Sequence, residues 1–515
     1  MSGSEVDATT GAEPTVLREE EQRLRLPDDA VVPPLASDGW SAAPGEAVLL
    51  EADYVDTEDL RLLRWGVTLR RREGGSDAGW HLKVPLAGDD AARDEVRLPL
   101  DAGAPDEVPA PLADIVRGFV RSALLVHVAR IRSERRPVVL ADADGPLVEV
   151  VDDRVEATRD GVVVAAFRVA EVEVLGEPDD RRRAAMDATV ELLTGVGGTP
   201  QPAGKLATVL APDGVGEPDV VVPPEPDAHS PARDAVGHVL AAQVRDLVLA
   251  DLAARRRLPD AVHRLRVAAR RLRSQLRAFG PVLDDAWARR LRDELAWAAD
   301  GMGAARDTEV FRERLDAHAE QLSQEGRAGA VPHIAAWVDA RLAAASEAAL
   351  TTLRSDRYLA LLDDLVEAAR APRLTDDADG GARRILTPLA RRPVRALRKA
   401  VQRLDASSTA EDWHRARIRA KRARYAVDAI APLMGSGTAR RSAALERVTD
   451  VLGELHDAVV AQATLRELAS DARMSGSAGF ALGRLAAIEQ EREGEARARF
   501  ADVWRDARSD IRWKR

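Results

Sequence analysis

The chain of 515 residues contains no cysteine, only 3% aromatic residues and no long apolar run. Without cysteine there is no disulfide framework and no thiolate chemistry, which is typical of the cytoplasm. No apolar run approaches the ~20 residues that a membrane helix needs. Residues 1–15 are polar and acidic and do not have the apolar segment of a signal peptide. We therefore expect a cytoplasmic protein that does not enter a membrane, with a disordered stretch at residues 1–15.

Basic residues are not in excess either, because 86 Asp and Glu outnumber 75 Lys and Arg and give a net charge of -11. A general nucleic-acid binder is usually basic over a whole domain, so this balance speaks against specific nucleic-acid binding. The length and the 45% hydrophobic content allow two or more domains, each with its own core. Basic residues can therefore recognise an anionic ligand only where several of them lie close together.

Residues 16–210 have the pattern of a strand-rich domain with α+β character. Turn residues separate several short alternating runs, and helical patterns interrupt them at about 110–123 and 178–193. Many short antiparallel strands in one domain predict a closed or nearly closed β-barrel. The strands are expected at Val48–Glu51, Val67–Arg72, Trp80–Val84, Glu95–Leu100, Val138–Leu140, Leu147–Val151, Val162–Val164 and Phe167–Leu175.

A Pro-rich segment at 211–229 reads as a semi-rigid linker, and beyond it the composition changes to long Ala-, Leu- and Arg-rich segments with 3.6-residue periodicity. Residues 230–515 are therefore predicted to form an all-α bundle. Gly303–Asp307 corresponds to Gly453–Asp457, and Arg245 to Arg395, at an offset of 150 residues. This offset predicts an internal duplication, with repeats at about 230–325 and 381–510.

A basic cassette occurs once in each repeat. A histidine is followed at +3, +7, +8 and +10 by Arg or Lys, and positions 0, +3, +7 and +10 share one face of a helix. Like charges at this spacing repel by a few tenths of a kcal/mol per pair, so the stripes predict a polyanionic ligand. The cassettes are His263, Arg266, Arg270, Arg271 and Arg273, and His414, Arg417, Lys421, Arg422 and Arg424.

The strand-rich domain carries paired carboxylates at alternating positions. Glu19 and Glu21 share a strand face with Arg23, and Glu171 and Glu173 repeat the spacing. Buried carboxylates at i and i+2 are costly unless cations compensate them, and Mg²⁺ or Mn²⁺ suits such oxygen ligands. Basic pairs alternate similarly, so we expect a barrel that binds a compact anion with its metal. These pairs are Arg70 and Arg72, His81 and Lys83, Arg93 and Arg97, and Arg130 and Arg132.

The domain resembles the CYTH, or triphosphate tunnel metalloenzyme, family over about residues 16–210. The run Glu19-Glu20-Glu21-Gln22-Arg23 is similar to the signature Glu-x-Glu-x-Lys. The resemblance implies a tunnel-like antiparallel barrel and metal-dependent hydrolysis of inorganic triphosphate. Further matches follow in the family's order at Tyr54–Thr57, Asp59-Leu60, Gly66–Arg72, Leu82–Pro85, Glu149–Asp153, Glu171–Glu173 and Lys205-Leu206.

The resemblance also implies roles for individual residues. Metal ligands would be Glu19, Glu21, Glu171 and Glu173. Glu149 and Asp153 would support the metal or position water, and would form the catalytic set with Glu21 and Arg23. Phosphates would be held by Arg23, Arg70, Arg72, Lys83, Arg97, Arg130, Arg132 and Lys205.

The sequence departs from the family pattern at Arg23, which stands where the signature has lysine, and at Gly204, where serine is usual. Arginine keeps its proton near neutral pH, so any acid or base role of that lysine would be lost. Phosphate binding would survive, because a guanidinium suits phosphate geometry. These departures put catalysis in more doubt than binding.

Residues 230–510 resemble the CHAD domain, a conserved-histidine α-helical domain. The fuller motif Leu452–Asp457 occurs only in the second repeat, where the first has Arg306 in place of His456. The resemblance implies that the domain binds inorganic polyphosphate and that the protein associates with polyphosphate granules. The binding residues would be Arg245, His263, Arg266, Arg270, Arg273, Arg395, His414, Arg417, Lys421, Arg424 and His456.

Several alternatives stay open at this point. The histidines could be structural or could bind a metal, and the basic stripes could be salt-bridged to acidic helices. At the level of function, the protein could target polyphosphate without catalysis, or the tunnel could act on a nucleoside triphosphate. A nucleoside triphosphate substrate lacks support, since the sequence contains no Gly-rich phosphate loop and no aromatic cluster that could stack on a base.

Overall fold

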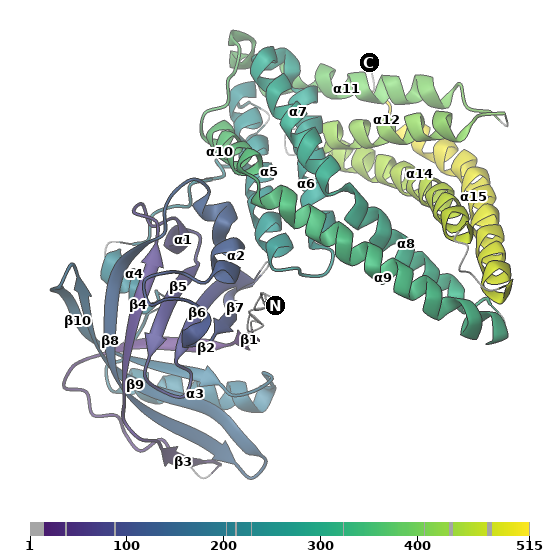
Figure 1. The fold of residues 1–515 in the computed structure, drawn as a ribbon. Helices are drawn as coiled ribbons and strands as arrows, with labels where there is room; N and C mark the ends of the chain where they lie inside the picture. Colours follow the sequence, from purple (N-terminus) through teal and green to yellow (C-terminus); the bar gives the residue numbers. More distant parts are fainter. Residues whose placement is uncertain are drawn as a thin grey trace, which may run out of the picture. The chain divides into compact units, whose positions relative to one another are not determined.

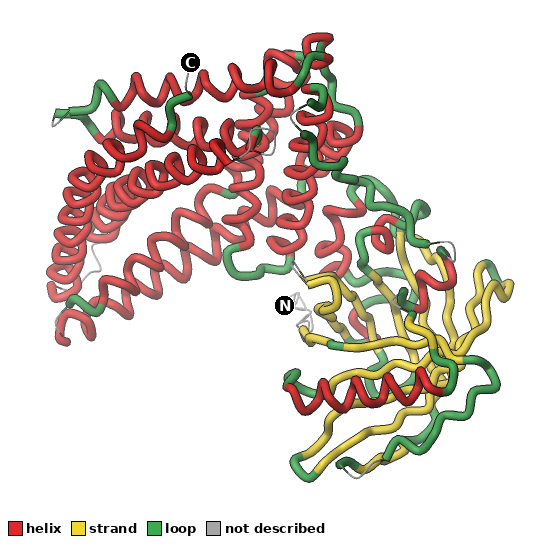
Figure 2. The backbone as a smooth tube through the Cα atoms, turned by 180° about the vertical axis from the view of Figure 1, so that it is seen from behind, coloured by secondary structure: helices red, strands yellow, loops and turns green. Residues whose placement is uncertain are grey.

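The computed structural model describes residues 15–36, 39–86, 89–201, 203–211, 214–227, 229–322, 324–405, 407–431, 436–470 and 476–513. The chain divides between Asp219 and Val220 into two compact units. The first unit is rich in strands and the second is helical (Figure 2). This confirms the predicted α+β barrel followed by a helical domain, whereas the disorder expected at residues 1–15 falls almost entirely outside the described residues.

The first unit is built on one antiparallel sheet (Figure 1). Its strands pair in the order β1-β7-β6-β5-β4-β8-β9-β10-β2-β11, and β3 pairs with β8 beside this path. The strands are β1 (Thr15–Glu19), β2 (Glu21–Leu26), β3 (Ser41–Pro44), β4 (Val48–Asp56), β5 (Thr68–Glu73), β6 (Gly79–Leu86), β7 (Asp89–Leu98), β8 (Val126–Asp142), β9 (Gly145–Arg159), β10 (Val162–Val174) and β11 (Thr199–Pro200).

The N-terminal strands close this sheet into a barrel. β1 pairs with β7 at one end of the strand order, and β2 pairs with β10 near the other end. Only Glu20 separates β1 from β2, so one continuous stretch of chain joins the two ends. Closure removes most of the free sheet edge and leaves an interior that side chains of alternate parity can line.

In the described residues of the first unit, the α-helices are α1 (Arg61–Arg64), α2 (Ala110–Val120), α3 (Asp180–Gly195) and α4 (Lys205–Leu210). Helix α3 begins after Asp179, whose side chain accepts a hydrogen bond from the backbone N–H of Arg182 at 2.8 Å. It packs on β2, β9 and β10 and shares a buried apolar cluster with Leu24 and Leu26. Because these leucines face outward under α3, the opposite parity of β2 faces the barrel interior.

The second unit contains long helices and no strand in its described residues. None of the described helices is both long enough and apolar enough to cross a membrane. The helices are α5 (Ala232–Arg255), α6 (Ala261–Ala278), α7 (Asp285–Gly301), α8 (Gly303–Ala319), α9 (Gln324–Arg354), α10 (Asp356–Arg370), α11 (Ala382–Val401), α12 (Ala410–Asp428), α14 (Ser436–Ala469) and α15 (Gly476–Asp510).

The two predicted cassettes lie on α6 and α12, which contact one another. Helix α12 starts with a capping box in which Thr409 and Asp412 satisfy each other's backbone N–H groups. The helix packs between α11 and α14, and buried residues of α11, α12, α14 and α15 form one core. The apolar sides of α6 and α12 are thus fixed by packing, which leaves their basic sides to line a cavity.

The expected linker at 211–229 is partly packed rather than free in its described residues. Asp219 is 3% exposed and accepts a hydrogen bond from Trp65 Nε1 at 2.7 Å and an ion pair from Arg121. In the second unit, Arg245 donates to the carbonyl of Val220 at 3.2 Å. The middle of the segment is therefore held in place, with Asp219 bound to the first unit and Val220 to the second.

Candidate functional site

The barrel of the first unit encloses a cavity of about 600 Å³ lined mainly by charged side chains. Strands on all sides contribute to it, together with the start of α4 and residues 215–218. The charged side chains that line it are Glu21, Arg23, Arg64, Arg70, Arg72, Asp77, Lys83, Arg93, Glu95, Arg97, Arg135, Glu149, Glu171, Glu173, Lys205 and Glu217. Such a cavity suits a compact, highly charged ligand.

Three of these glutamates form one row across adjacent strands. Glu173 on β10 is the register partner of both Glu21 on β2 and Glu149 on β9. Side chains that stand directly opposite have Cβ atoms about 4.5–5.5 Å apart, and like charges in such pairs repel. The row therefore favours a bound cation.

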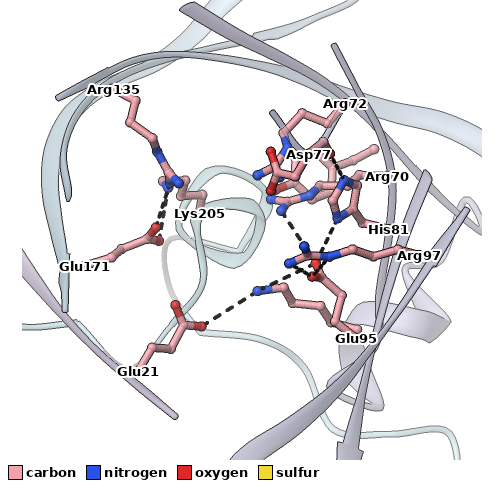
Figure 3. Close-up of polar contacts among 12 residues, drawn as sticks. Glu21, Arg70, Arg72, Asp77, His81, Glu95, Arg97, Arg135, Glu171 and Lys205 are labelled. Atoms are coloured by element: carbon pink, nitrogen blue, oxygen red, sulfur yellow. Dashed lines mark hydrogen bonds and ion pairs between the residues drawn. The ribbon is translucent and has the colours of Figure 1, made fainter. Parts of the chain in front are cut away.

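Glu171 stands on the same wall but is already surrounded by cations. Lys205 Nζ and Arg135 Nη2 each lie 3.0 Å from its carboxylate oxygens (Figure 3). Arg23 Nε lies 3.5 Å away. Burial alone would raise the pKa of the Glu171 carboxyl, but Lys205, Arg135 and Arg23 outweigh burial and hold that pKa well below its usual range. Glu171 thus organises three cations that face the cavity.

Asp153 lies behind this cluster rather than on the cavity wall. It is fully buried, and its carboxylate accepts from Lys205 Nζ at 2.6 Å and from Arg135 Nη2 at 2.8 Å. The expected role of Asp153 as a water-positioner stays a prediction, and its carboxylate is occupied by these two cations and does not line the cavity. We assign it the positioning of those two side chains.

A second cluster is organised by Glu95, which is 1% exposed. His81 Nδ1 lies 3.0 Å from Glu95 Oε1, Arg70 and Lys83 each reach that oxygen at 3.9 Å, and Arg97 pairs with Glu95 Oε2 (Figure 3). Burial alone would raise the pKa of Glu95, but the His81 hydrogen bond and the charges of Lys83 and Arg70 lower it far below its usual range.

Arg72 shows that positive charge in the barrel is not fully neutralised. Burial, together with the positive charges of Arg70 and Arg135, lowers the pKa of Arg72 to about 9, although Arg72 also pairs with Asp77. Burial is the largest cause of this shift, and Arg70 and Arg135 add a repulsion that Glu95 offsets only in part. An anion in the cavity would relieve this repulsion.

The structure places most of the expected tunnel residues around this one cavity: Glu21, Arg23, Arg70, Arg72, Lys83, Arg97, Glu149, Glu171, Glu173 and Lys205. The side chain of Glu19 lies outside the described residues. Sequence reasoning did not single out Arg135 or Glu95, and it noted His81 only as part of an alternating pair. The alternation of β8 carries the signal for Arg135, since it continues the buried parity of Ile131 and Ser133.

Arg130 and Arg132 do not line the cavity, and the expectation that they do is wrong. Each side chain is 56% exposed, with Arg130 paired to Asp53 at 2.7 Å and Arg132 to Glu51 at 3.8 Å. Both belong to the outward parity of β8. The two arginines do share one face of the strand, as their spacing predicts, but spacing alone does not tell which face of the sheet lies inside the barrel.

The second unit has a cavity of about 680 Å³ among α6, α8, α12 and α14. Both cassettes meet there. The basic and histidine residues that line it are His263, Arg266, Arg270, Arg271, Arg314, Arg417, Lys421, Arg424 and His456, and the acidic ones are Asp450, Glu454 and Asp457.

Repulsion among these cations is visible in the pKa of Lys421. Burial, together with the charges of Arg417 and Arg270, lowers the pKa of its ammonium to about 7, and Asp457 offsets only part of this shift. Burial and the charge of Arg417 likewise lower the pKa of His456 to about 4. Among the described residues that line the cavity, basic side chains outnumber carboxylates.

The alternative of fully salt-bridged stripes holds only in part. Arg424 pairs with Glu446 and lies 3.7 Å from Asp428, while Arg417 is 3.8 Å from Asp457. Arg266 donates to the carbonyl of Gly303 at 2.9 Å, which orients its guanidinium. Acidic neighbours therefore neutralise part of the positive charge of the two cassettes, but the pKa of Lys421 stays lowered.

Four expected polyphosphate ligands do not line this cavity. His414 packs against His456, with their Nδ1 atoms 3.3 Å apart. Arg245 bonds to Val220, Arg273 lies near Arg277 and Arg422 and lowers the pKa of both, and Arg395 is exposed on α11. The basic stripe on α6 thus extends beyond the cavity. Arg271 and Arg314 line the cavity, although neither was among the expected polyphosphate ligands.

Comparisons with known proteins agree with this two-part organisation. The CYTH domain matches residues 18–198 and the CHAD domain matches residues 238–466. The uncharacterized proteins Rv2226 and MT2285 of Mycobacterium tuberculosis, from strains H37Rv and CDC 1551, are each 34% identical over 474 residues. Those alignments cover 87% of this chain and 88% of either relative. The chain therefore belongs to the family of proteins that join a CYTH domain to a CHAD domain.

Solved structures resemble parts of the chain. PptA from Streptomyces chartreusis has a TM-score of 0.45 and 26% identity, and covers 54% of this chain and 100% of its own. The CHAD domain from Ricinus communis has a TM-score of 0.45 and 26% identity over 57% of this chain and 96% of its own. HpAC1 from Hippeastrum, described as having a dominant triphosphatase activity, has a TM-score of 0.24 and 16% identity over 37% of this chain and 94% of its own.

Proposed function

We propose that the barrel hydrolyses inorganic triphosphate with the help of a divalent cation and that the helical unit binds inorganic polyphosphate. The observation that carries the first part is that one cavity combines a row of three carboxylates with two clusters of cations. Hydrolysis of a phosphoanhydride depends mainly on positioning and charge neutralisation, which these two features supply together.

The carboxylate row fits a hard divalent cation in its donor chemistry. Glu21, Glu149 and Glu173 offer oxygen ligands from adjacent strands, as Mg²⁺ or Mn²⁺ prefers. As the described side chains stand, no three acidic or histidine groups are gathered closely enough to hold an ion. The resemblance adds Glu19 to this set, whereas Glu171 is engaged by three cations. A bound cation would neutralise phosphate oxygens and polarise the attacking water.

The basic side chains would hold the phosphates from two walls. Arg70, Lys83 and Arg97 stand around Glu95, and Arg23, Arg135 and Lys205 stand around Glu171. Water attacks the terminal phosphorus, the P–O bond to the neighbouring phosphate breaks, and Glu149 accepts the proton of the attacking water. Arg23 binds phosphate and transfers no proton, because a guanidinium stays charged.

The test is phosphate release from inorganic triphosphate with Mg²⁺ and with Mn²⁺. Glu21→Gln should reduce release at least a hundredfold, because it removes a carboxylate from the row. Glu20→Gln is the matched control, since Glu20 pairs with Arg183 on the outside of the barrel at 3.0 Å. If the wild-type protein releases no phosphate with either metal, the barrel only binds its ligand. Faster release from ATP would instead favour a nucleotide substrate.

The lining of the helical cavity supports the second part, because its described residues include seven Arg and Lys side chains and three carboxylates. Charge-assisted hydrogen bonds from Arg and Lys are well suited to a chain of phosphates. Lys421→Gln combined with Arg270→Gln should weaken polyphosphate binding at least tenfold in a titration with long-chain polyphosphate. Arg415→Gln, on the exposed side of α12, is the control and should bind normally. Equal binding by both proteins would contradict the assignment.

A further inference from the structure

Helix α11 has an apolar inner side and an outer side on which every charged residue is basic. Its inner residues, among them Leu386, Leu389 and Leu397, are buried, and the helix packs against α12 and α5 (Figure 1). The helix carries no Asp or Glu. Its seven Arg and Lys residues are all exposed or half-buried: Arg383, Arg384, Arg391, Arg392, Arg395, Arg398 and Lys399.

These seven cations have no ion-pair partner in the described part of the chain, where no Asp or Glu oxygen lies within 4.0 Å of them. Other exposed arginines of the unit do have partners: Arg290 lies 2.7 Å from Asp364, and Arg357 lies 2.7 Å from Glu294. Cations three or four residues apart on a helix repel by a few tenths of a kcal/mol per pair. The outer side of α11 is thus a concentration of positive charge that an anionic partner would stabilise.

The internal duplication shows that this position in the fold does not require a basic helix. Helix α5 is the counterpart of α11 in the first repeat, because each packs on the helix that carries its repeat's cassette. The two helices also start side by side: the N–H of Ala232 donates to the carbonyl of Gly380 at 2.8 Å, and the N–H of Ala382 to that of Ser230 at 2.9 Å. Yet α5 balances three arginines with three aspartates: Arg233, Arg245 and Arg255, and Asp234, Asp246 and Asp251.

The side chains on the outer side of α11 restrict the class of anion. Apart from the cations, the exposed residues of the helix are Pro388 and Ala396. This surface therefore lacks the aromatic side chains that stack on single-stranded bases and the large apolar side chains that enter a membrane surface. It also lacks hydroxyl and amide groups that would recognise base edges or a 2′-hydroxyl. Contact with the phosphates of a DNA duplex needs none of these groups.

The dimensions of α11 also favour a rigid polyanion. The helix of 20 residues is about 30 Å long, and a duplex presents one phosphate per ~3.4 Å along each strand. A rigid duplex can meet many cations of one straight helix with little loss of conformational entropy. The flexible polyphosphate chain is better held where cations from several helices surround it, and α11 does not line that cavity. In residues 220–515 Lys and Arg outnumber Asp and Glu, so the acidic balance of the whole chain comes from the first unit.

We propose that the outer side of α11 binds the phosphate backbone of duplex DNA without sequence preference. The guanidinium groups donate charge-assisted hydrogen bonds to phosphate oxygens, and the release of counterions from the duplex drives association. This surface goes beyond the triphosphatase and polyphosphate-binding roles proposed above and does not depend on either of them.

The test is a fluorescence-anisotropy titration of a labelled, mixed-sequence duplex with the full-length protein at low salt. We expect saturable binding that Arg392→Gln combined with Arg395→Gln weakens at least tenfold. The same variant should reduce the slope of log affinity against log salt by about two, because two phosphate contacts are lost. Arg289→Gln combined with Arg290→Gln is the matched control, since it removes equal charge from exposed arginines that have acidic partners, and it should bind as the wild type does.

Thermal melting shows whether each variant is folded, and all four substituted side chains are exposed, so we expect no loss of fold. Absence of saturable duplex binding by the wild type would overturn the proposal, as would equal losses in the two double variants, which would mean that net charge alone sets the affinity. Loss of duplex binding in Lys421→Gln combined with Arg270→Gln, but not in the α11 variant, would place the duplex at the polyphosphate cavity instead. Binding to anionic vesicles that depends on Arg392 and Arg395, without duplex binding, would replace DNA by a membrane surface.

Discussion

The two large cavities are both basic, but they balance their charge differently. In the barrel, Glu95 and Glu171 each gather several cations, and a carboxylate row lies beside them. In the helical unit, the carboxylates that meet the cations are more exposed: 33% for Asp457 and 50% for Glu446, against 1% for Glu95 and 14% for Glu171. One cavity holds its cations with buried carboxylates, and the other holds them with carboxylates that solvent reaches.

This difference suggests distinct tasks for similar side chains. Cations that are fixed by buried carboxylates keep one geometry, as the placement of a reacting phosphate requires. Cations that repel one another are stabilised by a long anion, which relieves their repulsion. Such binding does not require that the anion take one precise position. The comparison therefore predicts that the two cavities respond differently to salt, charge removal and pH.

Salt should produce the largest difference. Polyphosphate binding to the helical cavity should fall by about a thousandfold between about 50 and about 200 mM salt, if six or more phosphates are contacted as in nucleic-acid complexes. Triphosphate binding to the barrel should fall much less, because its cations are buried and partly neutralised. Titrations of both ligands to Glu21→Gln, which should not turn triphosphate over, would measure both slopes. Equal slopes would remove the distinction.

Removal of a carboxylate should destabilise the barrel more than the helical unit. Asp153→Asn removes the fully buried carboxylate from Arg135 and Lys205 and leaves them Glu171 alone, which should cost about 3 kcal/mol of unfolding free energy. Asp457→Asn removes a carboxylate that is 33% exposed and 3.8 Å from Arg417, so we expect a loss below about 1 kcal/mol. Urea unfolding followed separately for each unit would measure both, and a larger loss in Asp457→Asn would reverse the comparison.

Strand alternation predicted much of the barrel site, since Glu21 with Arg23 and Arg70 with Arg72 do face one cavity. It failed for Arg130 and Arg132 because a strand offers two parities, and packing decides which one is inside. The row of Glu149, Glu173 and Glu21 needs the strand register, which sequence does not supply and which bulges shift.

Helical periodicity predicted part of the site in the second unit, as strand alternation did in the barrel. It predicted that His263, Arg266 and Arg270 share one face of a helix, and these residues do line one cavity with the second cassette. It could not predict where the helices contact, so Arg273 was assigned to a cavity that ends before it. Arg314 was missed because it comes from α8, outside both cassettes.

The pH dependence of polyphosphate binding should be moderate and confined to the helical cavity. Lys421 has a pKa of about 7 in the free protein, and a bound anion would raise it by favouring the charged form. Affinity should therefore rise severalfold as pH falls from 8.5 to 6, with proton uptake near pH 8. Titrations in buffers of different ionisation enthalpy would measure the uptake. Lys421→Arg should bind with little pH dependence, and an unchanged pH profile in that variant would refute the role of Lys421.

Arg23→Lys should have the smallest effect, and it tests whether the barrel uses charge alone. A lysine at this position keeps the positive charge beside Glu21 and Glu171, so triphosphate turnover should change by less than about tenfold. Arg25→Lys, an exposed position two residues along β2, is the control and should change nothing. The decisive measurement is the pH–rate profile: a new limb in Arg23→Lys alone would mean that proton transfer at this position contributes to catalysis. An unchanged profile would mean that fixed cations and the carboxylate row suffice.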